Sequence, residues 1–242
     1  MGRATTLFLA KQGFIVYAGS RSPQKLVDID HKNIYPIELD IRDFDNIKQA
    51  ISKIGRIDIL INNAGYGLVS SVEEVDEVQM QEQFNINVFG LLRVSKAVIP
   101  IMREQKSGMI INISSFLGKI GLPLFTFYNA SKYAVEGITD SLRYELRDFN
   151  IKVHSIMPGF FDTNFARDNL VINRKIFDQT SPYSKIASTL IPTIADEINY
   201  GNNANEVAEL IFEIISSEKF PARVTAGEKA IDTLPIPKGS GF

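Results

Sequence analysis

A tyrosine and a lysine, Tyr128 and Lys132, stand four positions apart in the segment FTFYNASKYAVEG, residues 125–137. The segment has a helical pattern, and this spacing places both side chains on one helix face, one turn apart. A free phenol has a pKa near 10, and a neighbouring ammonium lowers that pKa by favouring the phenolate. The pair could therefore exchange protons with a substrate. The alternative is structural: a tyrosine at a helix interface beside a solvated lysine.

Short, nearly continuous apolar runs alternate with longer amphipathic segments along the chain. Such runs are typical of parallel strands that are covered on both faces. Strands are predicted at residues 14–20, 33–39, 58–65, 108–115 and 152–159, with a weaker candidate at 223–227. Helices are predicted at residues 3–12, 43–54, 77–105, 126–148 and 204–218, and Pro100 should kink or end the third. The alternation predicts an α/β fold with a doubly wound, Rossmann-like parallel sheet.

A single domain is predicted for residues 1–242, because no low-complexity linker divides the chain. Residues 161–203 are less periodic and rich in Asn, Ser, Thr and Pro. A long irregular insertion of this kind is typical of a lid or binding segment. The tail, residues 228–242, is predicted to have little regular structure.

Composition and charge argue against several classes of function. The net charge of −2, without a block of like charges, argues against nucleic acid or an anionic membrane surface as a partner. The chain has no Cys and only two His, so we expect no metal site. The apolar run near the N-terminus is too short for a signal peptide, and no stretch reaches the length of a membrane span. A cytoplasmic protein is therefore predicted.

Polar and small residues follow several of the predicted strands. Ligands of an open parallel sheet collect at the carboxyl ends of its strands. The predicted strands end in Asp40, in NNAG (62–65), in Ser114 and Ser115, and in Pro158 and Gly159. Each is also an ordinary turn residue by itself, but together they predict a ligand site along this edge.

Taken together, these motifs resemble the short-chain dehydrogenase/reductase family, in its order and spacing, over residues 2 to about 165. The family's Tyr-x-x-x-Lys pair is YNASK (128–132), and Ser115, thirteen residues earlier, matches its catalytic serine. NNAG (62–65) matches its cofactor-side strand motif, NVFG (87–90) the segment of its catalytic asparagine, and PGFFDT (158–163) its nicotinamide-side loop. A lone Tyr-x-x-x-Lys is a weak signal, whereas five motifs in register are a strong one.

The resemblance implies a role for each matched residue. Tyr128 would be the general acid for a carbonyl oxygen, or the base in the reverse direction. Lys132 would stabilise the phenolate and hold the nicotinamide ribose, and Ser115 would donate a hydrogen bond to the substrate oxygen. Asn87 would hold a water that links Lys132 to solvent, unless it bonds only to backbone. Ser114 is an adjacent competitor of Ser115. The resemblance adds Asn63, Ala64, Gly65, Pro158, Gly159 and Thr163 as cofactor-binding residues.

The end of the second family strand discriminates between NAD and NADP. An acidic residue there favours NAD, because its carboxylate bonds the ribose hydroxyls and repels a 2′-phosphate. This chain instead has Ser20 followed by Arg21, and a guanidinium suits a phosphate by charge and by its fork of donors. NADP is therefore favoured over NAD, although a surface arginine before the turn at Pro23 would look the same. By resemblance, Asp40 meets the adenine amino group and Ile41 packs beside the ring.

The family's first strand and most of its glycine-rich turn have no counterpart here. The chain begins MGRATTLFLAKQGF, in which Gly2 matches the last glycine of that turn. The turn normally holds the cofactor pyrophosphate, and the missing strand would lie centrally, between residues 14–20 and 58–65. Two explanations are open: a sequence that starts late within a longer protein, or a truncated relative that binds cofactor poorly.

An apolar carbonyl or alcohol substrate is expected, because the segment that varies with substrate in the family is rich in apolar side chains here. These side chains have the alternative of packing the lid onto its own domain. They are Phe160, Phe161, Phe165, Leu170, Ile172, Phe177 and Tyr183, with Arg167, Arg174 and Lys175 among them. In the family, the helix pair that corresponds to 77–105 and 126–148 packs against a neighbouring subunit, which implies a homodimer or homotetramer.

The sequence thus predicts an NADP-dependent oxidoreductase that interconverts a carbonyl and an alcohol by hydride transfer. The alternative is a truncated, non-catalytic Rossmann-like protein that acts through protein contacts. A serine hydrolase is poorly supported, because the chain has no G-x-S-x-G elbow and neither His31 nor His154 has a triad context.

Overall fold

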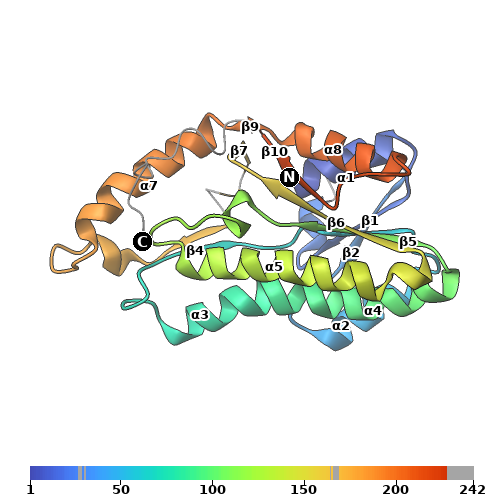
Figure 1. Cartoon of the computed structure of the whole chain (residues 1–242), viewed down its shortest axis with the longest axis horizontal. Coiled ribbons are helices and arrows are strands. Elements are labelled where there is room, and N and C mark those ends of the chain that lie inside the picture. Colours follow the sequence, from blue (N-terminus) through green and yellow to red (C-terminus); the bar gives the residue numbers. More distant parts are fainter. Residues whose placement is uncertain (27–28, 30, 164, 166–168, 228–242) are drawn as a thin grey trace.

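The computed structural model describes residues 1–26, 29, 31–163, 165 and 169–227 (Figure 1). Its main sheet has four parallel strands in the order β10–β6–β5–β3, and β1 and β2 form a second parallel pair. All six predicted strands are confirmed. Their bounds are β1 Val16–Ser20, β2 Ile34–Glu38, β3 Ile59–Asn62, β5 Gly108–Ile113, β6 Ile151–Pro158 and β10 Arg223–Ala226.

The β1–β2 pair and the main sheet are separate sheets. β1 is hydrogen-bonded to β2 and β3 to β5, and no pairing joins β1 to β3 within the described part of the chain. In the family that the sequence resembles, the first strand is expected between these two, that is, between β1 and β3. Two further parallel pairs involve residues 161–203: β4 (Gly67–Val69) pairs with β8 (Leu170–Ile172) of this segment, and β7 (Phe161–Asp162) pairs with β9 (Asn202–Asn203) at its two ends.

Helices cover both faces of the main sheet (Figure 1). α1 (Gly2–Lys11) and α8 (Ala204–Ser216) lie on one side, and α2 (Phe44–Ser52), α4 (Leu91–Gln105) and α5 (Thr126–Glu145) on the other. Successive strand side chains alternate between these layers, so Ile110 packs with Val98 of α4 whereas Ile111 packs with Ile211 of α8. The doubly wound architecture predicted from the sequence is confirmed.

The helix predicted over 77–105 is built from three pieces. α3 (Glu77–Phe84) runs into a π-helical turn, η2 (Asn85–Gly90), which continues into α4. Pro100 does not end the helix: α4 continues past it to Gln105, with Pro100 on its exposed side. By length and composition this stretch could cross a membrane, contrary to our sequence analysis, but core helices pass the same test. Val94, Val98 and Met102 of α4 are buried in the core of this protein.

The predicted irregular segment 161–203 contains a regular helix, so that expectation is wrong. α7 (Ser184–Asn199) buries an apolar stripe with helical spacing, Ala187, Leu190, Ile194 and Ile198. Pro192 lies on the exposed side and interrupts the sequence pattern without interrupting the helix. Short helical turns complete the fold: η1 Pro23–Leu26, η3 Phe116–Gly118, η4 Arg147–Phe149 and η5 Arg174–Phe177. The tail predicted at 228–242 lies outside the described residues.

Candidate active site

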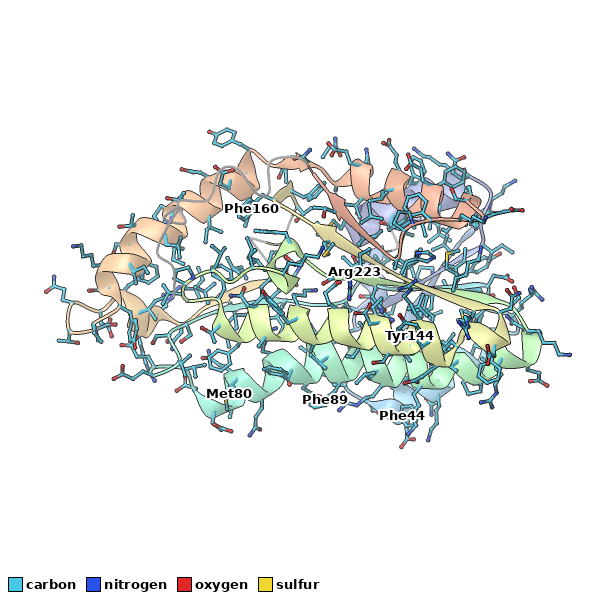
Figure 2. The ribbon with its side chains drawn as sticks, in the orientation of Figure 1. Phe44, Met80, Phe89, Tyr144, Phe160 and Arg223 are labelled. Atoms are coloured by element: carbon cyan, nitrogen blue, oxygen red, sulfur yellow. The ribbon has the colours of Figure 1, made fainter. Side chains whose placement is uncertain are left out.

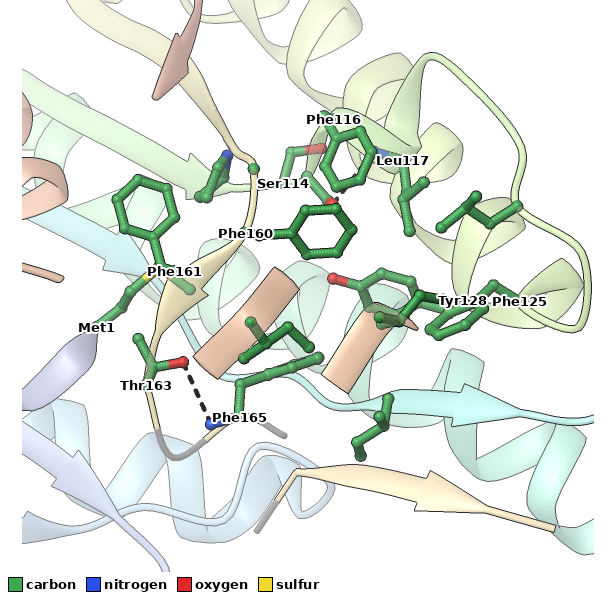
Figure 3. A pocket seen from close by; sticks show the side chains of 17 residues that line it. Met1, Ser114, Phe116, Leu117, Phe125, Tyr128, Phe160, Phe161, Thr163 and Phe165 are labelled. Carbon is green, nitrogen blue, oxygen red and sulfur yellow. Dashed lines mark hydrogen bonds between the residues drawn. The ribbon is translucent and has the colours of Figure 1, made fainter. Parts of the chain in front are cut away.

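Tyr128 and Lys132 lie on the inner face of α5 and are both buried, with 8% and 7% of their surface exposed. The spacing of the two residues therefore reflects a buried pair and not a solvated helix surface. The hydroxyl of Tyr128 points into a cavity whose walls are largely apolar (Figure 3). The tyrosine ring is held between two aromatic rings, Phe125 at 6.3 Å and Phe165 at 6.0 Å between centroids.

The ammonium of Lys132 is anchored to the carboxyl end of β5. Its Nζ donates a hydrogen bond of 2.9 Å to the carbonyl oxygen of Ile113 and lies 5.6 Å from the centroid of the Tyr128 ring. A buried cation needs such an acceptor because it has lost its hydration. This contact fixes the position of α5 against the end of the central strand, where Ser114 and Ser115 follow.

Ser115 is the serine that meets the tyrosine. It precedes η3, its Oγ accepts the backbone N–H of Leu117 at 3.2 Å, and it forms a side-chain hydrogen bond with Tyr128. Ser114, its competitor in the sequence, also lines the cavity, but its buried Oγ has no hydrogen-bond partner.

Burial moves the two acid–base groups in opposite directions. Loss of hydration raises the pKa of Tyr128 to about 12, and the hydrogen bond with Ser115 opposes this shift. Loss of hydration lowers the pKa of Lys132 to about 8, opposed by the negative charge of Glu136. The expectation that Lys132 depresses the pKa of the tyrosine is therefore wrong for this structure. Desolvation of the phenolate outweighs the nearby ammonium, whose Nζ is bonded to a carbonyl instead.

Asn87 is buried within the π-helical turn, and its amide connects two segments. Its Oδ1 accepts the N–H of Tyr66 at 3.0 Å, and its Nδ2 donates to the carbonyl of Tyr66 at 2.9 Å and to Ser131 Oγ at 3.0 Å. Asn87 thus forms hydrogen bonds with the backbone, as the alternative interpretation expected. It also bonds the hydroxyl of Ser131, the residue before Lys132. The water relay remains a prediction.

Two glycines permit close approach on the cofactor side of the predicted site. A Cβ on Gly65 would lie 3.1 Å from Asn87 Oδ1 and 3.8 Å from Lys132 Nζ. A Cβ on Gly2 would lie 2.7 Å from Asn63 Nδ2. The structure therefore brings Gly2, the segment Asn63–Ala64–Gly65 and the buried pair to one edge of the sheet. Because Gly2 and Gly65 have no side chains, a phosphate ester or ribose could approach the backbone here, beside the buried ammonium of Lys132.

The predicted nucleotide-selecting residues lie at the ends of β1 and β2. Arg21 is exposed directly after β1, and Ser20 Oγ accepts the N–H of Ser22 at 3.1 Å. Asp40 is engaged by Arg42, whose Nη2 lies 2.6 Å from Asp40 Oδ2, and this hydrogen-bonded pair lowers the pKa of Asp40 to about 2. The sequence analysis missed Arg42. Ile41 packs against Gly90, where a Cβ would lie 2.6 Å from Ile41 Cδ1.

The loop after β6 forms one wall of the cavity. Pro158, Gly159 and Thr163 all line it, Gly159 N–H donates to the carbonyl of Ala226, and Thr163 Oγ1 accepts the N–H of Phe165 at 3.2 Å (Figure 3). The predicted lid contributes Phe160, Phe161, Phe165 and Leu170. Apolar lining that the sequence analysis missed comes from Met1, Phe116, Leu117, Leu122, Phe125, Ile194 and Ile198.

The remaining predicted lid residues do not line this cavity. Ile172 and Tyr183 pack against the same apolar cluster from outside, and Phe177 is 42% exposed. Arg174 and Lys175 are exposed, Lys175 pairs with Asp76, and Arg167 lies outside the described residues. The cavity wall formed by α7 could have been predicted from the sequence, because Leu190, Ile194 and Ile198 are apolar residues at helical spacing. No candidate metal cluster occurs among the residues that the structure describes.

Comparison with known proteins identifies the family. Residues 1–170 match the family described as short chain dehydrogenase. The chain belongs to the short-chain dehydrogenase family. It is therefore an oxidoreductase of the NAD(P)-dependent dehydrogenase/reductase type, and the readings as a serine hydrolase or a non-catalytic protein gain no support from its relatives.

Curated relatives and solved structures agree with this assignment. A 3-ketodihydrosphingosine reductase from Bacteroides thetaiotaomicron is 36% identical over 226 residues, 93% of this chain and 83% of that protein. A 3-oxoacyl-[acyl-carrier-protein] reductase from Thermotoga maritima is 36% identical over 173 residues, 67% of this chain and 70% of that protein. The crystal structure of a short-chain dehydrogenase from Streptomyces avermitilis is 31% identical, has a TM-score of 0.83, and matches 96% of this chain and 86% of its own.

The high pKa of Tyr128 is testable without substrate or cofactor. Because burial keeps the phenol protonated, the chain and its Tyr128→Phe variant should show the same phenolate absorbance up to about pH 10. Ultraviolet difference spectroscopy measures this, with circular dichroism as the control for folding. An extra ionisation in the parent chain between pH 7 and about 9 would show that the phenol is already activated.

Proposed function

We propose that this protein interconverts a carbonyl and an alcohol on an apolar substrate, using NADP, with Tyr128 as the acid and base. One observation carries the proposal: the Tyr128 hydroxyl faces an apolar cavity beside Ser115, and the buried ammonium of Lys132 lies behind its ring. A cavity of this kind excludes water from the place where the substrate oxygen would change its charge.

When bound, a nicotinamide cofactor would supply the hydride for reduction of the carbonyl carbon. Tyr128 donates its phenolic proton to the carbonyl oxygen, and the raised pKa ensures that this proton is present at neutral pH. Ser115 donates a hydrogen bond to the same oxygen as negative charge develops there. The Lys132 ammonium stabilises the phenolate that remains. In the direction of oxidation, the phenolate receives the proton from the alcohol.

The apolar substrate is supported by the walls of the cavity. Aromatic and aliphatic side chains from η3, the lid and α7 surround the hydroxyls of Tyr128 and Ser115. The relative from Bacteroides thetaiotaomicron is named a 3-ketodihydrosphingosine reductase, that is, for a ketone. A small polar ketone would leave this apolar surface unfilled, so we expect it to react poorly.

The choice of NADP rests on Arg21. Its exposed guanidinium after β1, with Ser20 in place of an acid, suits a 2′-phosphate. A short-chain dehydrogenase from Burkholderia cenocepacia, 26% identical with a TM-score of 0.72, was solved in complex with NADP. The residues that would hold the cofactor are Gly2, Ser20, Arg21, Asp40, Ile41, Asn63, Ala64, Gly65, Tyr128, Lys132, Pro158, Gly159 and Thr163.

Replacement of Tyr128 by Phe tests the acid. We expect kcat for NADPH-dependent ketone reduction to fall about 10²- to 10⁴-fold, because the proton donor is lost while the ring remains. The matched control is Tyr200→Phe, since Tyr200 follows α7 and is 81% exposed. A steady-state assay with medium-chain and long-chain ketones measures both. Full activity in Tyr128→Phe would refute the assignment.

Replacement of Arg21 by Ala tests the cofactor preference. A charged hydrogen bond to phosphate is lost, so NADPH should bind about tenfold more weakly while NADH binding is unchanged. Fluorescence titration of both cofactors measures this. Arg56→Ala is the control, because Arg56 is exposed and pairs with Asp58. It precedes the N-terminal end of β3, whereas the predicted cofactor site lies at the carboxyl ends of the strands. Equal losses for NADPH and NADH would contradict a role in selecting the phosphate.

A homodimer or homotetramer and a cytoplasmic location are also proposed. Exposed apolar side chains of the helices support self-association, among them Phe89 and Tyr144 (Figure 2). Tyr133 of α5 is exposed as well. Light scattering after size-exclusion chromatography should give two or four times the chain mass. Tyr144→Glu should lower that mass, because it places a charge in the expected contact; a monomeric parent chain would contradict the proposal.

A further inference from the structure

Glu136 is a buried carboxylate one helical turn beyond Lys132 on α5. It is 6% exposed, and its Oε2 accepts hydrogen bonds from Arg223 Nε at 2.7 Å and from Ser155 Oγ at 3.2 Å. Its other oxygen, Oε1, is buried without a hydrogen-bond partner. A buried carboxylate is costly unless positive charge compensates it, so the charges around Glu136 decide what it does.

Arg223 compensates Glu136 only in part. This arginine comes from β10 and lies between the strand and α5 (Figure 2), where it also pairs with Asp140. One guanidinium therefore serves two carboxylates. Charged groups near Glu136 include Arg223 of β10 and, on α5, Lys132 and Asp140, while Ser155 of β6 donates its hydroxyl to Glu136. Arg143 lies one turn beyond Asp140 on α5 and is exposed, whereas Lys132, one turn before Glu136, is buried with it.

Glu136 also meets the residues behind the catalytic pair. A Cβ on Gly118 would lie 3.2 Å from Glu136 Cγ, 3.0 Å from Ser114 Oγ and 3.0 Å from the carbonyl oxygen of Lys132. Four buried side-chain atoms of the described residues lack a hydrogen-bond partner, and two of them, Ser114 Oγ and Glu136 Oε1, belong to residues that meet here. Such groups call for an explanation, and at an active site a functional one is expected.

We propose that Glu136, which is paired with Arg223, is a positioning residue that keeps the Lys132 ammonium charged beside Tyr128. The inference rests on the proposed roles of Tyr128 and Lys132. A negative charge one turn away acts strongly in the poorly polarisable interior, where it opposes the loss of hydration of the ammonium. The opposing influence of Glu136 on the pKa of Lys132 agrees with this geometry. The alternative is a purely structural role (a brace), in which Glu136 only connects α5 to β10 through its ion pair with Arg223.

Glu136→Gln separates charge from bracing. The amide oxygen can still accept from Arg223 and Ser155, but the negative charge is gone. In the cofactor-free chain with ¹³C-labelled lysine side chains, the Cε signal of Lys132 is identified by its loss in Lys132→Met. We expect that signal to titrate near pH 8 in the parent and about one pH unit lower in Glu136→Gln. Glu145→Gln, an exposed change on the same helix, should not move it.

An unchanged titration of Lys132 in folded Glu136→Gln would overturn the proposal and leave Glu136 as a brace. Should Glu136→Gln not fold, Glu136→Met removes the same charge at similar volume and should give the same shift. The NMR titration stands apart from activity. A chain that shows the Lys132 shift but reduces no ketone contradicts the proposed function alone. An active chain without the shift contradicts only the role of Glu136.

Discussion

The structure depends on one costly arrangement: a phenol and an ammonium buried together on the inner face of α5. The ammonium of Lys132 cannot remain there without an acceptor, and the carbonyl of Ile113 at the end of β5 supplies it at 2.9 Å. That contact requires α5 to pack closely along the central strands, and apolar layers on both faces of the sheet hold it there. The doubly wound fold thus serves to keep two desolvated groups in register.

The cavity is built around the same buried pair. One part of its apolar wall, from Phe116 to Phe125, lies between Ser115 and Tyr128 in the sequence, and the other part comes from the segment after β6 and from α7, further along the chain. Burial removes water from the phenol, and this desolvation is what raises its pKa. A phenol that stays protonated suits the proposed role of Tyr128 as a proton donor to a carbonyl, and the proposed role of Lys132 is to stabilise the phenolate that results.

The sequence predicted what depends on local pattern. Apolar runs located all six strands, and the spacing of Tyr128 and Lys132 located the centre of the candidate site. It did not predict α7, because Pro192 and many polar residues obscured the apolar stripe that the helix buries. It also missed Arg42 beside Asp40 and the pair of Glu136 with Arg223, since the latter residues are 87 positions apart and meet only through the sheet. The direction of the Tyr128 pKa was predicted wrongly, because desolvation by distant segments cannot be read from a helix alone.

The most direct test is a crystal structure of the chain with NADPH and an unreactive analogue of an apolar ketone. We expect the oxygen of the analogue within about 3 Å of both Tyr128 Oη and Ser115 Oγ, and its apolar part against Phe160 and the α7 stripe. An analogue bound in the cavity with its oxygen turned away from Tyr128, or bound elsewhere while NADPH occupies the edge of the sheet, would contradict the assignment of the acid.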